Sequence, residues 1–324
     1  MRIVLSGRTA RAPIRDALSV MAGVELVEAD TMDEVLAQLA TADALILSDP
    51  RGPDGARLAE ALHRDDRRVR WVQMVSAGSS GISSHRLPDR LVVTNQGGVM
   101  AATVAEHALT LILALNRALP AAFTAQASGR WAPDSLRPQL RTLEGATILI
   151  VGVGHVGGVL AKLLTPFGAR IVGVTRDGAS RQGLQQTAPI AALDDALAHA
   201  DVVAICLPGS AETRGLFDAG RLAAMKRGAI LVNVGRGEVV DADALTTALM
   251  SGHLRGAALD VTEPEPLPDG HPLWRAPNLI LTPHVAGGGN PRSGARIAQM
   301  VVDNLGRFMR GEPLHHQIDL GRRS

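Results

Sequence analysis

Short apolar runs and amphipathic stretches alternate along the N-terminal part of the chain. The apolar runs are bounded by polar or turn-forming residues and predict strands at 3–5, 24–27, 44–47, 69–75 and 91–93. Two stretches between them, 33–40 and 56–63, place apolar residues at helical spacing and predict helices. Strands that alternate with helices build a parallel sheet with helices on both faces, so this part predicts an open α/β sheet.

The same alternation returns in the second half of the chain. Strands are predicted at 148–151, 171–174, 202–206, 230–234, 257–261 and 279–281, and a final helix at 292–309. A long helix predicted over 101–119 joins the two sets. It is followed by the segment 120–144, whose prolines and weak periodicity indicate an arm or linker. We therefore expect two doubly wound parallel sheets, the second inserted in the first.

Three glycines follow the first strand of the second set. Gly152, Gly154 and Gly157 form the pattern G-x-G-x-x-G between a buried strand and a helix. The first glycine permits a tight turn, the second lets the backbone approach a pyrophosphate, and the third lets helix and strand pack closely. Amides at the N-terminus of that helix face the phosphate charge. We therefore assign residues 99–285 to a Rossmann dinucleotide-binding domain, inserted in a flavodoxin-like substrate domain of residues 1–98 and 286–324.

The end of the next strand indicates which dinucleotide to expect. An NAD site has a carboxylate there, about 20 residues past the glycines, that binds the ribose hydroxyls. Here Thr175 takes the usual acidic position and Arg176 follows it, and a hydroxyl with a guanidinium suits a 2′-phosphate. We expect NADP(H), with Arg181 as a further cation. NAD(H) is the alternative if the strand continues to Asp177, although Gly178 indicates that a turn has already begun.

Composition narrows the class of protein. Lysine and arginine together number 33 against 32 acidic residues, so we expect neither nucleic acid nor a membrane surface as a partner. The only cysteine, Cys206, lies in an apolar run and is predicted to be a buried strand residue, and no metal site is expected. Because there is no cysteine pair, no hydrophobic leader and no apolar helix of spanning length, we expect a cytoplasmic protein.

Polar patches follow three successive predicted strands. They read NVGRGEVVD at 233–241, DVTEPEP at 260–266 and TPHVAG at 282–287. Open parallel sheets bind ligands at the carboxyl ends of their strands, so the three patches are expected at one edge. Together with the glycine pattern they resemble the D-isomer-specific 2-hydroxyacid dehydrogenases, in particular the glyoxylate and hydroxypyruvate reductases. The resemblance covers essentially the whole chain, including NQGGVMAATVAEH at 95–107, Gly129-Arg-Trp131 and the turn at 207–213.

Residue types in these patches suit the reduction of a 2-keto acid. That reaction needs a hydride donor, a cation that holds the carboxylate and polarises the ketone, and an acid that protonates the developing alkoxide. Arg236 offers a permanently charged fork for the carboxylate and the neighbouring carbonyl oxygen. His284, directed by Pro283, can donate the proton, and Glu265 can stabilise its imidazolium form. We therefore expect Arg236, Glu265 and His284 to be the catalytic residues of an NAD(P)-dependent enzyme.

The resemblance also implies which residues contact cofactor and substrate. Asp260 is expected to orient the nicotinamide carboxamide, with Leu207 and Pro208 against the adenosine. The expected cofactor contacts are Gly152, Gly154, His155, Val156, Gly157, Thr175, Arg176, Leu207, Pro208, Thr213, Val234, Asp260 and Thr103. The substrate is expected to meet the loop of Ser76, Ala77 and Gly78, whose amides bind its carboxylate, together with Arg236 and His284.

The arm is expected at a subunit interface. In the family that the chain resembles, this region packs across a two-fold partner. Phe123, Trp131 and Leu136 lie in a segment with little apolar pattern of its own and need a surface to pack against. We therefore expect a homodimer.

The chain departs from the pattern of the family in three places. Ser80 stands where many relatives have an aspartate, Thr262 stands in place of a bulky aromatic residue, and glycines occupy 287–289. Such changes affect the shape of the substrate site more than the type of reaction.

Other functions remain open. Formate dehydrogenases share the fold but carry glutamine at the position of Glu265, which argues against that reaction. Phosphoglycerate oxidation needs a cluster of cations that the loop 73–82 lacks, although Arg8 or Arg51 could approach it. Some relatives are NAD(H)-sensing corepressors, against which the absence of low-complexity tails argues. The expected substrate is a small 2-keto acid, glyoxylate or hydroxypyruvate.

Overall fold

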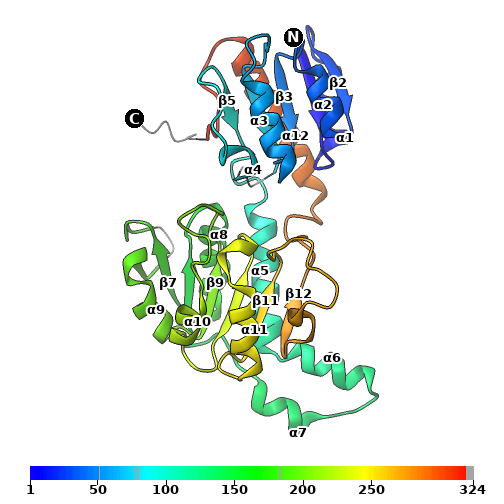
Figure 1. The fold of residues 1–324 in the computed structure, drawn as a ribbon. Helices are drawn as coiled ribbons and strands as arrows, with labels where there is room; N and C mark the ends of the chain where they lie inside the picture. The colour runs from blue at the N-terminus through cyan, green and yellow to red at the C-terminus, as the bar shows by residue number, and fades with distance from the viewer. Residues whose placement is uncertain (51, 77, 79, 182–183, 319–324) are drawn as a thin grey trace. The chain divides into compact units, whose positions relative to one another are not determined.

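In the computed structural model the chain forms two compact α/β units, each with its own parallel sheet (Figure 1). Unit 1 comprises Met1–Met100 and Gly289–Ser324, and unit 2 comprises Ala101–Gly288. The structure describes all residues except 51, 77, 79, 182, 183 and 319–324, so Ala77 and Arg51 lie outside the described residues. Two parallel sheets, each flanked by helices, confirm the predicted fold class.

Unit 1 is a five-stranded sheet with helices on both faces. Its elements are β1 (Arg2–Ser6), α1 (Arg11–Ser19), β2 (Glu25–Ala29), α2 (Met32–Gln38), β3 (Ala44–Leu47), α3 (Pro53–Leu62), β4 (Trp71–Met74), α4 (Ser80–Ser83), β5 (Val92–Thr94) and α12 (Pro291–Met309). The strand order β2-β1-β3-β4-β5 is that of flavodoxin-like sheets. Apolar side chains of α1 and α12 form the core on one face, and those of α2 and α3 form it on the other.

Unit 2 is a seven-stranded sheet in the order β12-β11-β10-β9-β6-β7-β8. Its strands are β6 (Thr147–Val151), β7 (Arg170–Thr175), β8 (Gln186–Pro189), β9 (Val202–Ile205), β10 (Ile230–Asn233), β11 (Gly256–Leu259) and β12 (Leu279–Leu281). Its main helices are α5 (Ala101–Asn116) and α8 (His155–Leu164) on one face, and α9 (Leu193–His199), α10 (Ala219–Ala224) and α11 (Ala242–Met250) on the other. The strand order reverses beside β6, and doubly wound sheets bind ligands outside the carboxyl ends of their strands at such a point.

Several elements were not predicted from the sequence, among them the helices α9, α10 and α11, the helix α1 and the strand β8. For α1 and β8 the reason is local. Helix α1 has a proline and several charged residues and buries only Ile14 and Leu18, too few for a clear apolar stripe. Strand β8 lies at the edge of its sheet, with no fully buried residue and a terminal proline. The predicted strands and the last helix are otherwise present within a few residues of their expected positions.

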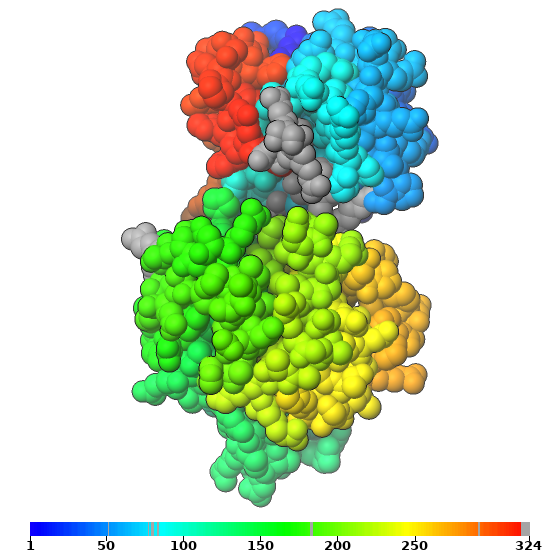
Figure 2. All heavy atoms as spheres, turned by 60° about the vertical axis from the view of Figure 1, so that its left-hand side comes forward, coloured from blue at the N-terminus to red at the C-terminus, as the bar shows by residue number. Residues whose placement is uncertain are grey.

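The arm contains more regular structure than expected. Helices α6 (Leu119–Ala127) and α7 (Pro133–Leu136) lie in the segment expected to be an arm or linker, for which no helix was predicted. The long helix ends at Asn116, and Ala118 with a φ of 52° redirects the chain by 66° into α6. Figure 2 shows the arm protruding from the body of unit 2. Within the described residues no single helix is long and apolar enough to cross a membrane. Helices α5 and α6 meet these criteria only when they are counted together across the bend between them.

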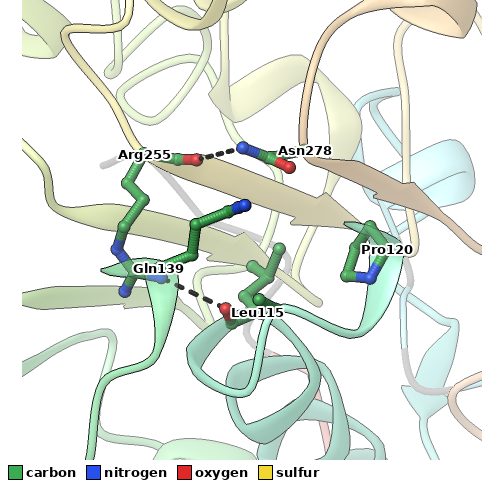
Figure 3. A pocket seen from close by; sticks show the side chains of 6 residues that line it. Leu115, Pro120, Gln139, Arg255 and Asn278 are labelled. Carbon is green, nitrogen blue, oxygen red and sulfur yellow. Dashed lines mark hydrogen bonds between the residues drawn. The ribbon is translucent and has the colours of Figure 1, made fainter. Parts of the chain in front are cut away.

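A small pocket lies at the root of the arm (Figure 3). Arg255, just before β11, donates from Nη1 to the carbonyl of Leu115 at 3.1 Å and from Nη2 to Oδ1 of Asn116 at 2.8 Å. A cation is favourable at a helix C-terminus, here that of α5. Burial lowers the pKa of Arg255. The pocket, whose other lining residues are Ala118, Pro120, Gln139 and Asn278, is thus part of the anchoring of the arm.

Candidate active site

The glycine loop between β6 and α8 has no room for side chains at two of its three glycines. Gly152 has a φ of 97°, and a Cβ atom there would lie 2.9 Å from Cδ2 of Leu207. A Cβ atom at Gly157 would lie 2.2 Å from the carbonyl oxygen of Gly152, so helix and strand are in close contact. Gly154 and His155, at the start of α8, are exposed. The amides at this helix N-terminus are therefore accessible to an anion.

The strand β7 ends at Thr175, which is buried, and Arg176 after it is exposed. The carboxylate of Asp177 accepts a hydrogen bond from the amide of Ala179 at 3.0 Å and one from the hydroxyl of Thr175 at 3.3 Å. The bond from the Ala179 amide holds the pKa of Asp177 below its usual value. Gly178 has a φ of 73°. The Asp177 carboxylate thus belongs to a turn that begins after the strand has ended.

The loop after β10 carries Arg236 and is closed by Asn233, which is fully buried. The side chain of Asn233 donates from Nδ2 to the carbonyl of Arg236 at 2.9 Å, and its Oδ1 accepts from the amide of Gly235 at 2.9 Å. The guanidinium of Arg236 is half-buried and donates from Nη1 to the carbonyl of Gly235 at 2.7 Å. A neutral side chain therefore fixes the turn that presents the cation.

Glycines on both sides of Arg236 allow this loop to pack closely against the loops after β9 and β11. A Cβ atom at Gly235 would lie 2.4 Å from the carbonyl oxygen of Leu207, in the loop after β9. A Cβ atom at Gly237 would lie 2.0 Å from the backbone of Thr262, in the loop after β11. Backbone atoms cannot move away as side chains do. The position of Arg236 is therefore set by steric contact with two adjacent loops.

His284 and Glu265 are brought together from the loops after β12 and β11. Nδ1 of His284 lies 2.7 Å from Oε1 of Glu265, and both side chains are about one-third exposed. His284 has a φ of 53°, in the left-handed region that residues other than glycine rarely occupy. Because Nδ1 faces the carboxylate, Nε2 is the ring nitrogen that can exchange a proton with a bound molecule.

Asp260, at the end of β11, holds the loop that carries His284. Its carboxylate accepts from the hydroxyl of Thr282 at 2.6 Å, from the amide of Val285 at 2.9 Å and from the amide of Ala286 at 3.0 Å. Its backbone carbonyl accepts from the amide of His284 at 2.8 Å. The residue is 2% exposed. The sequence pattern does not reveal this role, because the bonds connect segments more than 20 residues apart.

Helix α5 adds a residue that the sequence analysis misses. Nε2 of His107 lies 3.1 Å from Oγ1 of Thr282 and 3.6 Å from Oδ1 of Asp260. Thr103, expected near the cofactor, precedes His107 by four residues and so shares its helical face. That spacing is the signal that could have identified His107.

The remaining expected cofactor contacts lie on loops of unit 2. The hydroxyl of Thr213 donates to the carbonyl of Pro208 at 2.8 Å and accepts from the amide of Ser210 at 2.9 Å, so it shapes the loop after β9. Leu207, in the same loop after β9, lies against Gly152 of the glycine loop. Val234 follows β10 and is buried.

Cys206 was predicted to be a buried strand residue, but it lies just after the end of β9 and is only partly buried, so that prediction is wrong in part. Desolvation raises the pKa of its thiol to about 12, so the thiol is uncharged at neutral pH. No group of three or more metal-ligating side chains occurs among the described residues.

In unit 1 the loop after β4 is held by side-chain hydrogen bonds. Oγ of Ser76 donates to the carbonyl of Gly78 at 2.9 Å and accepts from the amide of Asp49 at 3.0 Å. The carboxylate of Asp49 accepts from the amides of Gly81 and Ile82 at 2.8 and 3.0 Å. Asp49 therefore supplies the carboxylate of this loop, where the chain has Ser80 in place of the aspartate of many relatives.

Comparisons with known proteins identify the family of the chain. The model of the "D-isomer specific 2-hydroxyacid dehydrogenase, NAD binding domain" matches residues 109–286. Over 251 residues the chain is 36% identical to the glyoxylate reductase of Thermofilum pendens, a match that covers 74% of this chain and 73% of that protein. Over 306 residues it is 31% identical to the D-3-phosphoglycerate dehydrogenase of Mycobacterium tuberculosis, covering 94% of this chain. The chain spans only 56% of the length of this second relative.

Solved structures of related proteins share the fold of this chain. A D-isomer specific 2-hydroxyacid dehydrogenase family protein from Aeromonas salmonicida is 33% identical, with a TM-score of 0.80 over 98% of both chains. A D-isomer specific 2-hydroxyacid dehydrogenase from Xanthobacter autotrophicus Py2, solved in complex with NADPH and MES, is 29% identical, with a TM-score of 0.80 over 99% of this chain and 98% of that one.

Proposed function

We propose that this chain, which belongs to the D-isomer specific 2-hydroxyacid dehydrogenase family of oxidoreductases, reduces glyoxylate or hydroxypyruvate to the 2-hydroxy acid. The observation that carries the proposal is the contact of His284 with Glu265 at 2.7 Å, at the sheet edge that also carries Arg236. An acid and a permanent cation are the groups that keto-acid reduction requires of the protein.

Arg236 and His284 have different roles toward the substrate. The guanidinium of Arg236 holds the carboxylate and polarises the ketone, in a position set by its flanking glycines. Nε2 of His284 donates a proton to the alkoxide oxygen as the carbonyl carbon accepts a hydride. Glu265 at Nδ1 stabilises the imidazolium and fixes the direction of the ring. In unit 1, we propose that the amides of the loop at Ser76 and Gly78 bind the substrate carboxylate.

The glycine loop fits a dinucleotide, because Gly154 has open space where a Cβ atom would stand and lies at the N-terminus of α8. When bound, the nicotinamide supplies the hydride. We propose NADP(H) as the cofactor, since Arg176 is exposed at the end of β7 while Asp177 is bonded within its own turn. The similar Xanthobacter protein was solved with NADPH. The other proposed contacts are Gly152, His155, Val156, Gly157, Thr175, Leu207, Pro208, Thr213, Val234, Asp260 and Thr103.

The experiment that tests the function is a substrate panel with both reduced cofactors. We expect the highest kcat/KM for glyoxylate or hydroxypyruvate with NADPH, and little activity on 3-phosphohydroxypyruvate. Arg176→Ala should reduce the ratio of kcat/KM for NADPH to that for NADH by about 10-fold or more. Arg170→Ala, at the opposite end of β7, is the matched control. No reduction of any 2-keto acid would refute the function, and a preference of the wild type for NADH would refute the choice of cofactor.

We also propose a homodimer formed through the arm. Trp131 and Phe123 are 97% and 61% exposed, which is unusual for large apolar side chains that serve no interface. Light scattering of the 33.9 kDa chain should give twice that mass at micromolar concentration. Trp131→Ser should weaken the dimer, while Trp274→Ser, at another exposed tryptophan, should not. A wild-type monomer would contradict the proposal.

A further inference from the structure

A chain of hydrogen bonds leads from helix α5 to the loop that carries His284. The carboxylate of Asp260 can only accept, so the hydroxyl hydrogen of Thr282 is committed to it at 2.6 Å. The oxygen of Thr282 is then an acceptor for Nε2 of His107 at 3.1 Å. This order of donors requires a hydrogen on Nε2 of His107. The polarity of the chain is therefore defined from His107 through Thr282 to Asp260.

Burial makes each donor to Asp260 important. The side chain of Asp260 is 1% exposed, and a carboxylate out of contact with water must be hydrogen-bonded or paired to remain stable. Nε2 of His107 lies 3.6 Å from Oδ1 of Asp260, and the His107 side chain is itself 22% exposed. The loss of His107 would leave the hydroxyl of Thr282 free to turn and the carboxylate with weaker support.

Asp260 in turn determines the backbone at His284. Its two oxygens hold the amides of Val285 and Ala286, the two residues that follow His284. The left-handed φ of 53° at His284 is unfavourable by about 1–2 kcal/mol for a residue other than glycine, so bonds from outside the loop must maintain it. A displacement of Asp260 would relax this backbone and move Nδ1 away from Glu265.

We propose that His107 is a positioning residue for His284, acting through Thr282 and Asp260 on the backbone that directs the ring toward Glu265 and the substrate. The inference rests on the proposed function, in which His284 is the acid. His107 itself touches neither Glu265 nor His284 among the contacts that the structure describes.

Three variants test the kinetic consequence. His107→Leu removes the donor while keeping an apolar volume, and it should lower kcat for glyoxylate reduction by about 10- to 100-fold, as is common for residues that orient a ligand from the second layer. KM for NADPH should change much less than kcat, because the glycine loop is untouched and only the contact expected between Asp260 and the nicotinamide could weaken. His107→Gln places an amide donor near the position of Nε2 and should restore most of kcat. Thr282→Val should act like His107→Leu.

The double variant His107→Leu/Thr282→Val should be no slower than either single variant, because both break the same chain of bonds. His253→Leu is the matched control: it removes a contact between Nε2 of His253 and the carbonyl of Met225 at 3.0 Å in the same unit. We expect wild-type kcat for that control. Additive losses in the double variant, or no recovery with His107→Gln, would overturn the positioning role in favour of general destabilisation.

A second measurement does not depend on the substrate. Amide hydrogen exchange of a peptide covering 282–288 should be faster in His107→Leu than in the wild type, with the remainder of unit 2 unchanged and protection recovered in His107→Gln. Unchanged exchange in this peptide overturns the inference whatever the activity. Wild-type kcat in His107→Leu, in an enzyme that His284→Asn inactivates, overturns the inference and leaves the proposed function intact. Absence of activity in the wild type refutes the function alone.

Discussion

The loop with Arg236 follows β10 and the loop with His284 follows β12 of the same sheet, yet the two loops are stabilised in different ways. The Arg236 loop is closed by a neutral amide, that of Asn233, and confined by glycines against two backbones. The His284 loop is held by a buried carboxylate, that of Asp260, whose bonds reach as far as α5. Steric confinement does not depend on charge, whereas a buried carboxylate depends on its donors. The part of the site that moves a proton is therefore the part most sensitive to distant substitutions.

The largest effect should follow from removing the proton donor itself. His284→Asn should lower kcat of keto-acid reduction by about 10²- to 10⁴-fold, because no other group replaces Nε2 as the acid. Binding of NADPH, measured by fluorescence titration, should remain near the wild-type value. Glu265→Gln should move the pH optimum downward, since the imidazolium loses the negative charge that stabilises it. Near-wild-type turnover in His284→Asn would eliminate His284 as the acid.

Substitutions at Asn233 and Asp260 test whether charge distinguishes the two loops. Asn233→Asp removes the donor to the Arg236 carbonyl and buries a charge, so the free energy of unfolding at neutral pH should fall by about 1–3 kcal/mol or more. The loss should diminish in mild acid, because a protonated carboxyl is neutral and can donate. Asp260→Asn places an amide group where acceptors are needed and should weaken the His284 loop at every pH. Denaturant unfolding across pH checks both. Equal pH profiles for the two variants would show that charge does not separate the loops.

The smallest effect concerns a carboxylate away from the site. Asp201 accepts from Nζ of Lys226 at 2.6 Å and from the amide of Thr147 at 2.9 Å. Burial alone would raise the pKa of Asp201, but these bonds and the charge of Lys226 together lower it. A carboxyl with a lowered pKa stabilises the fold above its unfolded-state value and loses that contribution as the pH falls through the folded-state value.

Asp201→Asn should therefore lower Tm at neutral pH, by an amount that disappears in strong acid. Thermal unfolding at pH 7 and at a series of acid pH values that extends below the usual carboxyl range measures the difference. Asp195→Asn, at an exposed position on α9, is the control. A Tm difference for Asp201→Asn that is as large in acid as at neutral pH would assign the loss to packing.

The periodic pattern was sufficient for most of both sheets. Strands such as β3 and β9 are buried along their whole length, so their apolar runs identify them without any knowledge of their neighbours. Short motifs at the ends of strands likewise identified the glycine loop and the residues Arg236, Glu265 and His284 as candidates. The contact between His284 and Glu265 shows that two of these candidates meet, while their catalytic roles stay predictions.

Elements with weak patterns were not predictable in the same way. Helix α6 is apolar without a single buried face, and strand β8 is partly exposed at an edge. Neither has the alternation that distinguishes a buried side from an exposed one. A left-handed residue at Ala118 also separates α6 from α5, and no residue type at that position signals it.

From the amino-acid sequence alone follow the two parallel sheets, the family and the chemistry of the candidate residues, since all three depend on local spacing and residue type. Only the tertiary structure reveals how the candidates are held. Thr282 and His107 are 175 residues apart and become neighbours because α5 packs against the sheet of unit 2. Asp49 reaches the loop at Gly81 across 32 residues in the same way. Hydrogen bonds of this kind are set by the packing of whole elements, which local periodicity does not encode.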